Sequence, residues 1–395
     1  MKPMIKPLGI AVASAAAAYS AVSVAQMPTV ANNALGDLAL VPYYTVEGSW
    51  VTGVHVVNTS AQTQVVKFRL RRAADSLDAL DFNIIMSPKD VWTGLISDDA
   101  NGQISFKNFG DTTCSAPQVT DGTFLMPPIY SEGAETGYVE VIGMGTPLSA
   151  VQGTVTTMGE STPFARGAKH VSGTPRDCAA VASNFLISSG VGAPGNVDFD
   201  TARQAASTVI TSSSDNLSSA SETTFGDTGN VLKVSYFIRD TETGVEFGDN
   251  AVHIADFLQE PAMTNQVSGI LSGDLDGFDF PDLNGGALSG AQRDRFNMIR
   301  ANTALGVSSL LNEWSTNPEN GAVVNWVVTL PGQYTMLNLP AYVQALDNDV
   351  ACSAGAVADL GAPIGAESPL SGSVGRCDFR DIPVRLSATA YNREE

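Results

Sequence analysis

Four aspartates between residues 274 and 285 form the densest group of oxygen ligands in the sequence. They are Asp274, Asp276, Asp279 and Asp282, and Asn284 adds a fifth donor in the same glycine-containing stretch. Calcium takes about six to eight oxygen ligands from loops of this composition. The spacing departs from an EF-hand, because Phe278 stands where the fifth position needs an oxygen and Gly285 replaces the closing glutamate. The stretch is therefore interpreted as either a calcium site or an acidic surface loop, and no other cofactor is expected.

Motifs for nucleophilic, zinc and nucleotide chemistry are weak in this chain. No G-x-S-x-G or H-E-x-x-H pattern occurs. Residues 190–195 match G-x-G-x-x-G. A dinucleotide site needs a strand before this motif and a helix after it, whereas the chain from Pro194 onward reads as a loop. His170 precedes a predicted helix start and could serve a site, although such a histidine more often packs or caps. A pair of carboxylates for glycoside hydrolysis stays open, because 41 acidic residues permit many pairs in space.

The net charge excludes several classes of partner. The 395-residue chain has 21 lysines and arginines against 41 acidic residues, which gives a formal charge of -20. Nothing in this balance offsets the repulsion of phosphate groups, so a nucleic-acid partner is not expected. Binding to an anionic membrane surface is disfavoured for the same reason.

The first 25 residues have the pattern of an export signal. Lys2 and Lys6 precede an apolar, alanine-rich run over residues 8–24, and Ser23 and Ala25 are small residues at the -3 and -1 positions of a cleavage site. The run is shorter than the roughly 20 residues needed to span a bilayer. We therefore expect cleavage after Ala25 and a mature chain without a transmembrane segment. The expected location is secreted or at the cell surface, with the periplasm as the alternative.

The cysteines fit an oxidising environment. The four are Cys114, Cys178, Cys352 and Cys377; none forms a C-x-x-C pair, and only 3 histidines are available to assist in zinc binding. An even number in an exported chain indicates disulfides. Three pairings are possible, and pairing of neighbours gives Cys114–Cys178 and Cys352–Cys377. Loop entropy predicts roughly 3–4 kcal/mol of stabilisation from each bond.

Residues 38–145 contain segments in which apolar and polar side chains alternate, separated by turns. Residues 51–58 and 64–71 alternate with period two, and in the second segment Lys67, Arg69 and Arg71 face one side while Val66, Phe68 and Leu70 face the other. Such a pattern is typical of a half-buried antiparallel strand. Further strands are expected over residues 38–46, 80–86, 91–96, 104–109 and 138–144. Short strands at this spacing predict a β-sandwich.

The strand–Asn58-Thr59-Ser60–strand–Ser87-Pro88-Lys89-Asp90 pattern across residues 51–96 resembles the immunoglobulin-like modules of bacterial surface proteins. Residues 38–92, 137–145, 170–178 and 325–331 are similar to uncharacterised exported proteins of Gram-negative bacteria. The resemblance covers about half of the chain in patches and implies no activity.

The remainder of the chain is predicted to be mixed. Thr174 and Pro175 read as the cap and first turn of a helix that continues to residue 187. Residues 205–224 are rich in serine and threonine and indicate a linker. Residues 231–247 read as a hairpin, residues 289–314 as helical, and residues 322–330 and 383–391 as strands; residues around His253 resemble an apolar helix.

These patterns predict a mainly β protein. We expect a signal peptide (1–25), an immunoglobulin-like antiparallel β-sandwich domain (26–150), a mixed segment with a Ser/Thr-rich linker (151–224) and a β-rich C-terminal domain with a few helices (225–395). The expected function is structural or adhesive, through protein partners or self-association at the cell surface or in the extracellular matrix. The alternative is a secreted or periplasmic hydrolase or carbohydrate-binding protein that uses carboxylates.

Overall fold

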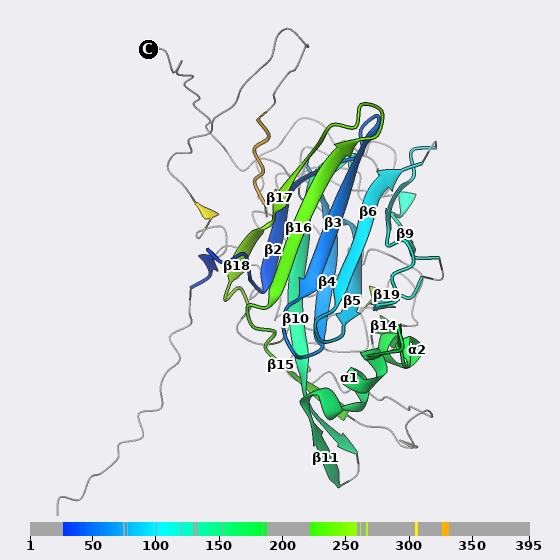
Figure 1. Cartoon of the computed structure of the whole chain (residues 1–395), viewed down its shortest axis with the longest axis vertical. Coiled ribbons are helices and arrows are strands. Elements are labelled where there is room, and N and C mark those ends of the chain that lie inside the picture. Colours follow the sequence, from blue (N-terminus) through cyan, green and yellow to red (C-terminus); the bar gives the residue numbers. More distant parts are fainter. Residues whose placement is uncertain are drawn as a thin grey trace, which may run out of the picture.

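Two antiparallel sheets packed face to face make up most of the computed structural model (Figure 1). It describes residues 27–73, 76, 78–99, 101–119, 121–128, 131, 133–152, 154–183, 185–187, 222–258, 261, 266–267, 305–306 and 326–331. Within these ranges the fold is mainly β, which confirms the predicted class. The immunoglobulin-like character of residues 51–96 stays a prediction.

The larger sheet has nine strands. Along its main path they are β1 (Thr29–Val30), β18 (Val252–Ala255), β2 (Leu38–Thr45), β10 (Thr136–Gln152), β4 (Gln64–Arg72), β5 (Asp78–Met86) and β8 (Cys114–Ala116). Two more strands pair with the second half of β10, namely β11 (Val155–Met158) and β15 (Glu222–Gly226). The 17-residue strand β10 is therefore shared between the body of the sheet and a smaller three-stranded extension.

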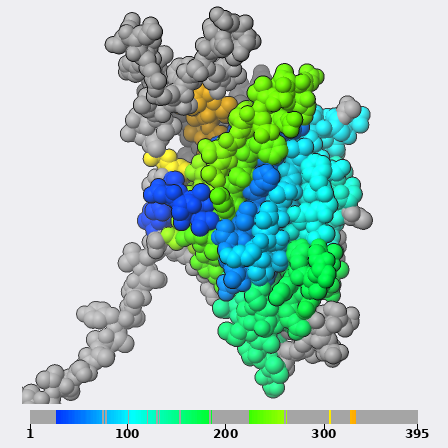
Figure 2. Space-filling model, viewed as in Figure 1, coloured from blue at the N-terminus to red at the C-terminus, as the bar shows by residue number. Residues whose placement is uncertain are grey.

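The second sheet has six strands and turns one face toward the viewer in Figures 1 and 2. In order they are β17 (Glu246–Asn250), β16 (Leu232–Asp240), β3 (Trp50–Asn58), β6 (Val91–Asp98), β7 (Ile104–Lys107) and β9 (Thr123–Leu125). Two small pairs complete the strands: β12 (His170–Val171) with β13 (Thr174–Pro175), and β14 (Leu186–Ile187) with β19 (Gln266–Val267).

Aromatic side chains from both sheets form the centre of the sandwich. Trp92 stacks on Phe106 with ring centroids 4.6 Å apart, and Phe82 stacks on Phe124 at 3.8 Å. Phe68, from the middle of the larger sheet, meets Trp92 edge-on at 5.2 Å. All five rings are fully buried. Because each buries a large apolar area, this cluster supplies much of the driving force that holds the two sheets together.

Two short helices cover one end of the outer face of the larger sheet. The helix α1 (Pro163–Ala168) follows the 3₁₀ turn η2 (Gly159–Ser161), and α2 (Cys178–Ser183) lies beside it. Phe164, Val181 and Phe185 pack there against Val65 and Ile85 of the sheet. None of the helices in the described ranges is long and apolar enough to cross a membrane.

The helix predicted with Thr174 as its cap and Pro175 as its first residue starts three residues later, at Cys178. Thr174 and Pro175 belong to β13, and Asp177 takes the capping role, because its Oδ1 accepts a hydrogen bond from the backbone N–H of Ala180 at 3.0 Å. Aspartate is a preferred N-cap residue, which accounts for the later start of the helix.

The predicted division at residues 150 and 224 is corrected by the strand pairing. All nine residues of β16 pair with β3, from Leu232 opposite Asn58 to Asp240 opposite Trp50. In addition, β18 pairs with β2, and β15, which the sequence placed at the end of a linker, pairs with β10. Residues 222–255 therefore belong to the same two sheets as residues 29–158. Composition marked a boundary here, but it carries no information about which distant strands pair.

Other local predictions had mixed outcomes. The predicted strands over residues 38–46, 51–58, 64–71, 80–86, 91–96, 104–109 and 138–144 and the hairpin over 231–247 are confirmed. The helix-like segment at His253 is wrong, because His253 lies in strand β18. Residues 326–330, predicted as strand, form none; the Thr329 hydroxyl donates to the carbonyl of Pro42 in β2. The predicted signal, the strand at 383–391 and all but two residues of the 289–314 helix lie outside the described residues.

Candidate functional site

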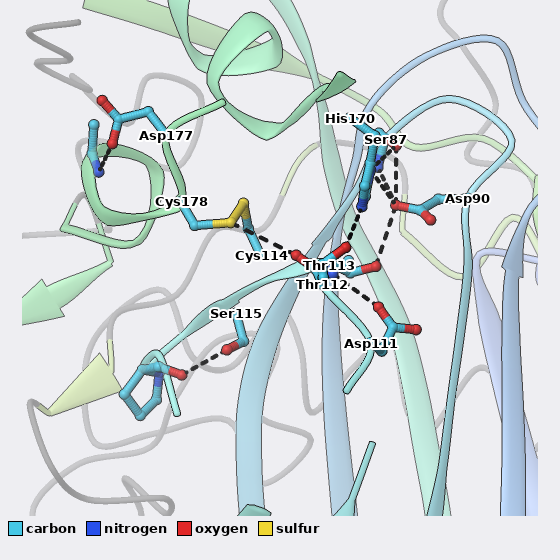
Figure 3. The surroundings of a disulfide bond; sticks show 12 residues. Ser87, Asp90, Asp111, Thr112, Thr113, Cys114, Ser115, His170, Asp177 and Cys178 are labelled. Atoms are coloured by element: carbon cyan, nitrogen blue, oxygen red, sulfur yellow. Dashed lines mark hydrogen bonds and ion pairs between the residues drawn. A yellow bond between two sulfur atoms is a disulfide. The ribbon is translucent and has the colours of Figure 1, made fainter. Parts of the chain in front are cut away.

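The predicted disulfide between Cys114 and Cys178 is present (Figure 3). Cys114 begins β8, at one edge of the larger sheet, and Cys178 begins α2. The two Cα atoms are 5.1 Å apart, within the usual range for a disulfide. The bond therefore fastens the helical cover to the sheet. Cys352 and Cys377, the second predicted pair, lie outside the described residues.

Loss of this bond should destabilise the protein by about 2–4 kcal/mol, because it closes a 64-residue loop in the unfolded chain. A double variant, Cys114→Ser with Cys178→Ser, should show the loss in denaturant unfolding. Under reducing conditions the wild type and the double variant should unfold at the same midpoint, because reduction then removes the Cys114–Cys178 bond from the wild type and any Cys352–Cys377 bond from both. An unchanged unfolding midpoint in the double variant would show that the bond does not support the fold.

A polar cluster lies beside the disulfide and is centred on His170. The Nδ1 atom of His170 is 2.9 Å from the Ser87 hydroxyl and 3.6 Å from Oδ2 of Asp90. On the other side of the ring, Nε2 is 3.2 Å from the Thr112 hydroxyl. The ring thus links the turn between β5 and β6, the segment before β8, and β12 (Figure 3). His170 is a candidate site residue from its sequence context, but its partners Thr112 and Ser87 are 58 and 83 residues away, so its neighbouring sequence does not reveal them.

The hydrogen bonds around His170 are not arranged as they are around an activated serine nucleophile. A serine relay needs the hydroxyl on one imidazole nitrogen and the carboxylate on the other, whereas Ser87 and Asp90 face the same nitrogen. Thr112 faces the opposite nitrogen, but its hydroxyl donates to the carbonyl of Gly173 at 3.0 Å. Asp90 Oδ2 is itself engaged by the backbone N–H and hydroxyl of Ser87. The cluster therefore cross-links three chain segments, as the packing interpretation of His170 expects.

A second polar group is buried on the outer face of the larger sheet. Asp81 lies 3.1 Å from Nζ of Lys67 and 3.4 Å from Nη2 of Arg69, and Nε of Arg71 lies 3.0 Å from Glu140. All five side chains are fully buried. The alternating pattern of β4 is confirmed, but the expectation of a half-buried strand is wrong, since every residue of β4 is buried. Buried charges require paired, hydrogen-bonded partners, and these contacts provide them.

Asp37 is a third unusual group, and no sequence signal marked it. Its carboxylate accepts backbone N–H groups of Phe257 at 2.9 Å and Leu258 at 2.7 Å, while its own carbonyl accepts the N–H of Gly143 at 2.7 Å. Burial raises the pKa of Asp37 to about 7; the two N–H groups oppose this shift, and the nearby Asp227 carboxylate adds to it. The side chain is essentially inaccessible to solvent. Asp37 therefore joins β2, β10 and the end of β18, and a dissolved substrate has no access to it.

The three-stranded extension of the larger sheet carries four exposed large apolar side chains, Leu148, Val151, Val155 and Met158. We call it the arm: β11, β15 and residues 146–152 of β10. Figure 1 shows it projecting below the sandwich. Leu148 is 51% exposed, Met158 61% and Val155 59%. By contrast, Phe225 on β15 is buried against Phe164 of α1. One face of the arm is thus packed on the helical cover at β15, while Val155 at the start of β11 is exposed on that same side. The opposite face is open.

Cross-strand geometry identifies the side chains on the open face. The hydroxyls of Ser149 and Thr224 meet at 2.7 Å across β10 and β15, and Ser149 stands opposite Met158 of β11. Val151, two residues further along β10, lies on the same face because side chains alternate. Leu148 packs over Gly226, where an added Cβ would meet it at 3.8 Å. Leu148, Val151 and Met158 therefore form one apolar strip.

The base of the arm is fixed to the sandwich. Glu160, in η2, accepts the backbone N–H of Thr63 at 2.5 Å and its hydroxyl at 2.9 Å. Thr146 donates its hydroxyl to the carbonyl of Thr63 at 2.9 Å. Both contacts join the arm to the start of β4, so its direction relative to the sheets is set by hydrogen bonds as well as by the continuous strand β10.

The calcium ligands, histidine and tryptophans singled out in the sequence have different outcomes. Asp274, Asp276, Asp279 and Asp282 lie outside the described residues, so the calcium site stays a prediction. Within the described ranges no group of three or more His, Cys, Asp or Glu side chains is arranged to hold a metal ion. His253 accepts the backbone N–H of Val234 at 2.8 Å, and burial lowers its pKa. Of the tryptophans, Trp92 is in the core and Trp326 is half exposed.

In comparisons with known proteins, no family model, no curated protein and no solved structure matches the chain.

Proposed function

We propose that this protein is an exported structural or adhesive component of the bacterial cell surface or extracellular matrix and acts by associating with proteins. The main support for this proposal is the exposed apolar surface of the arm. Exposed apolar surface that continues across several strands is uncommon on a monomeric soluble protein and is typical of an interaction site. The Cys114–Cys178 disulfide supports export, because such bonds persist in oxidising compartments.

The chemistry of the described polar groups supports association over turnover. A catalytic carboxyl or imidazole must reach a substrate. Asp37, Asp81 and Glu140 are buried, and His170 is held among hydroxyl groups whose protons are directed elsewhere. The arm, in contrast, exposes apolar side chains to solvent, which favours contact with another polypeptide.

Association can be tested on the purified mature protein. Light scattering across a concentration series should show self-association, or the protein should bind isolated envelope or matrix material. The same preparation should leave glycosidase, esterase and peptidase substrates unchanged. Turnover that disappears in a His170→Ala variant, with the fold intact, would favour the alternative of a secreted or periplasmic hydrolase. A protein that stays monomeric and binds no envelope or matrix material would contradict the proposal.

A further inference from the structure

The free edge of β11 differs in its chemistry from those of β15 and β17, two other strands with a single partner among the described residues, because both of these carry acidic residues. Within the described residues β11 pairs only with β10, and β17 pairs only with β16. Natural proteins protect free edges with charges, proline or bulges, because an unpaired row of N–H and C=O groups pairs with other strands. The β17 edge carries Glu246 and Asp249. The β11 edge, Val155–Met158, carries no charge and no proline.

The absence of charge extends over the whole hairpin. Residues 141–159, which lie between Glu140 and Glu160, contain no lysine, arginine, aspartate or glutamate. This is unusual in a chain with a formal charge of -20. Two copies of such a chain repel one another wherever acidic surfaces meet. Within the arm the acidic residue is Glu222 of β15, which is separated from β11 by β10. The uncharged edge of β11 is therefore a place where two copies can approach with little repulsion.

We propose that the free edge of β11 pairs with β11 of a second copy of this chain. The pairing is antiparallel, about a two-fold axis that passes between the two Thr156 residues. This inference rests on the proposed function and names the partner and the contact. A two-fold axis makes the interface self-complementary, as in most homodimers. The two arms then form one continuous six-stranded ribbon.

The sequence of β11 suits this register. Thr156 faces its own symmetry mate, and Val155 faces Thr157 of the second copy. Threonine pairs and β-branched pairs across antiparallel strands are favourable contacts, and these residue types favour strands. Because the axis is perpendicular to the sheet, the open faces of both arms lie on the same side. The strips formed by Leu148, Val151 and Met158 then lie on one face of the ribbon, on either side of the Thr156 pair, because Thr156 stands opposite Val151.

A matched pair of charge variants tests the surface. Thr156→Lys places a positive charge opposite itself on the two-fold axis, and Asn250→Lys places the same charge on the β17 edge. Both change the net charge of the chain equally. In sedimentation or light scattering of the mature protein, Thr156→Lys should raise the dimer dissociation constant by about tenfold or more, and Asn250→Lys should leave it unchanged.

Cysteine cross-linking tests the register. Thr156→Cys should give a covalent dimer under mild oxidation, because directly opposed Cβ atoms in an antiparallel pair are about 5 Å apart. Thr157→Cys lies one residue off the axis and should cross-link much less.

Equal cross-linking at both positions, or none at either, would overturn the inference. Self-association that survives Thr156→Lys would do so too, while leaving the proposed function standing with another contact. A monomeric protein that turns over substrate would instead remove the proposed function itself.

Discussion

Replacing Asp81 by Asn is expected to lower the free energy of unfolding by about 3–5 kcal/mol. The Asp81 carboxylate contacts both Lys67 and Arg69, and all three side chains are fully buried. Asparagine keeps the shape of the side chain but removes the charge. Two buried cations then lose a common counter-charge in a region where water cannot replace it. Chemical denaturation at neutral pH measures the loss.

Two further variants make the Asp81 experiment specific. Asp98→Asn removes an acidic residue that is exposed at the end of β6, and it should change stability by no more than about 0.5 kcal/mol. Adding Lys67→Met to Asp81→Asn removes one of the two cations and should recover part of the lost stability. A loss for Asp81→Asn that is no larger than the loss for Asp98→Asn would mean that the buried contacts contribute little.

The second large effect is a dependence of stability on pH that comes from Asp37. Its pKa is about 7 in the folded protein, chiefly because of burial, against 3.8 for the ordinary carboxyl. At a pH between 3.8 and about 7, Asp37 has released its proton in the unfolded chain and still holds it in the folded protein. The contribution of Asp37 is therefore fully present below about pH 4, falls as the pH rises, and is lost above about pH 7. The shift corresponds to a change on the order of 4 kcal/mol.

An Asp37→Asn variant isolates this contribution. The amide cannot ionise, so the difference in unfolding free energy between variant and wild type should change steadily from pH 4 to pH 7.5. Asn also offers one acceptor oxygen for two N–H groups, which subtracts about 1–3 kcal/mol at every pH. Asp227→Asn should move the wild-type transition to lower pH, because the Asp227 charge raises the pKa of Asp37. Identical pH slopes for wild type and Asp37→Asn would contradict the assignment.

The strands of the sandwich were predictable because their signal is local. In β3, β4 and β16 side chains alternate over nine residues, which is long enough for a period of two to stand out. The short strands β8, β9 and β18 have three or four residues and carry no such pattern. His253 was assigned to a helix-like segment for that reason.

The environment of the strands was less predictable than the strands themselves. Alternation in β4 indicates two different faces, and a face with Lys67, Arg69 and Arg71 is ordinarily exposed to water. The sequence of one strand cannot reveal that Asp81 and Glu140 lie on the neighbouring strands at matching positions. Asp37 is the same case: its unusual pKa depends on burial and on groups more than 180 positions away.

Disulfide pairing is an intermediate case. An even number of cysteines and a preference for neighbours along the chain predicted the Cys114–Cys178 bond, which is confirmed. The cluster beside it could not be predicted in the same way. The sequence marks His170 as a candidate, but its position among Ser87, Asp90 and Thr112 is set by how three distant segments fold together.

Strand β10 also determines how the protein responds to mechanical load. Its first half is paired with β2 and β4 on both sides, and its second half continues without interruption into the arm. Hydrogen bonds between antiparallel strands are perpendicular to the strand direction. A pull on the arm along β10 therefore loads all the bonds of the first half in shear, together and in parallel, whereas a sideways pull opens them one at a time. The shared strand gives the molecule a stiff axis along which tension at the arm passes directly into the middle of the larger sheet.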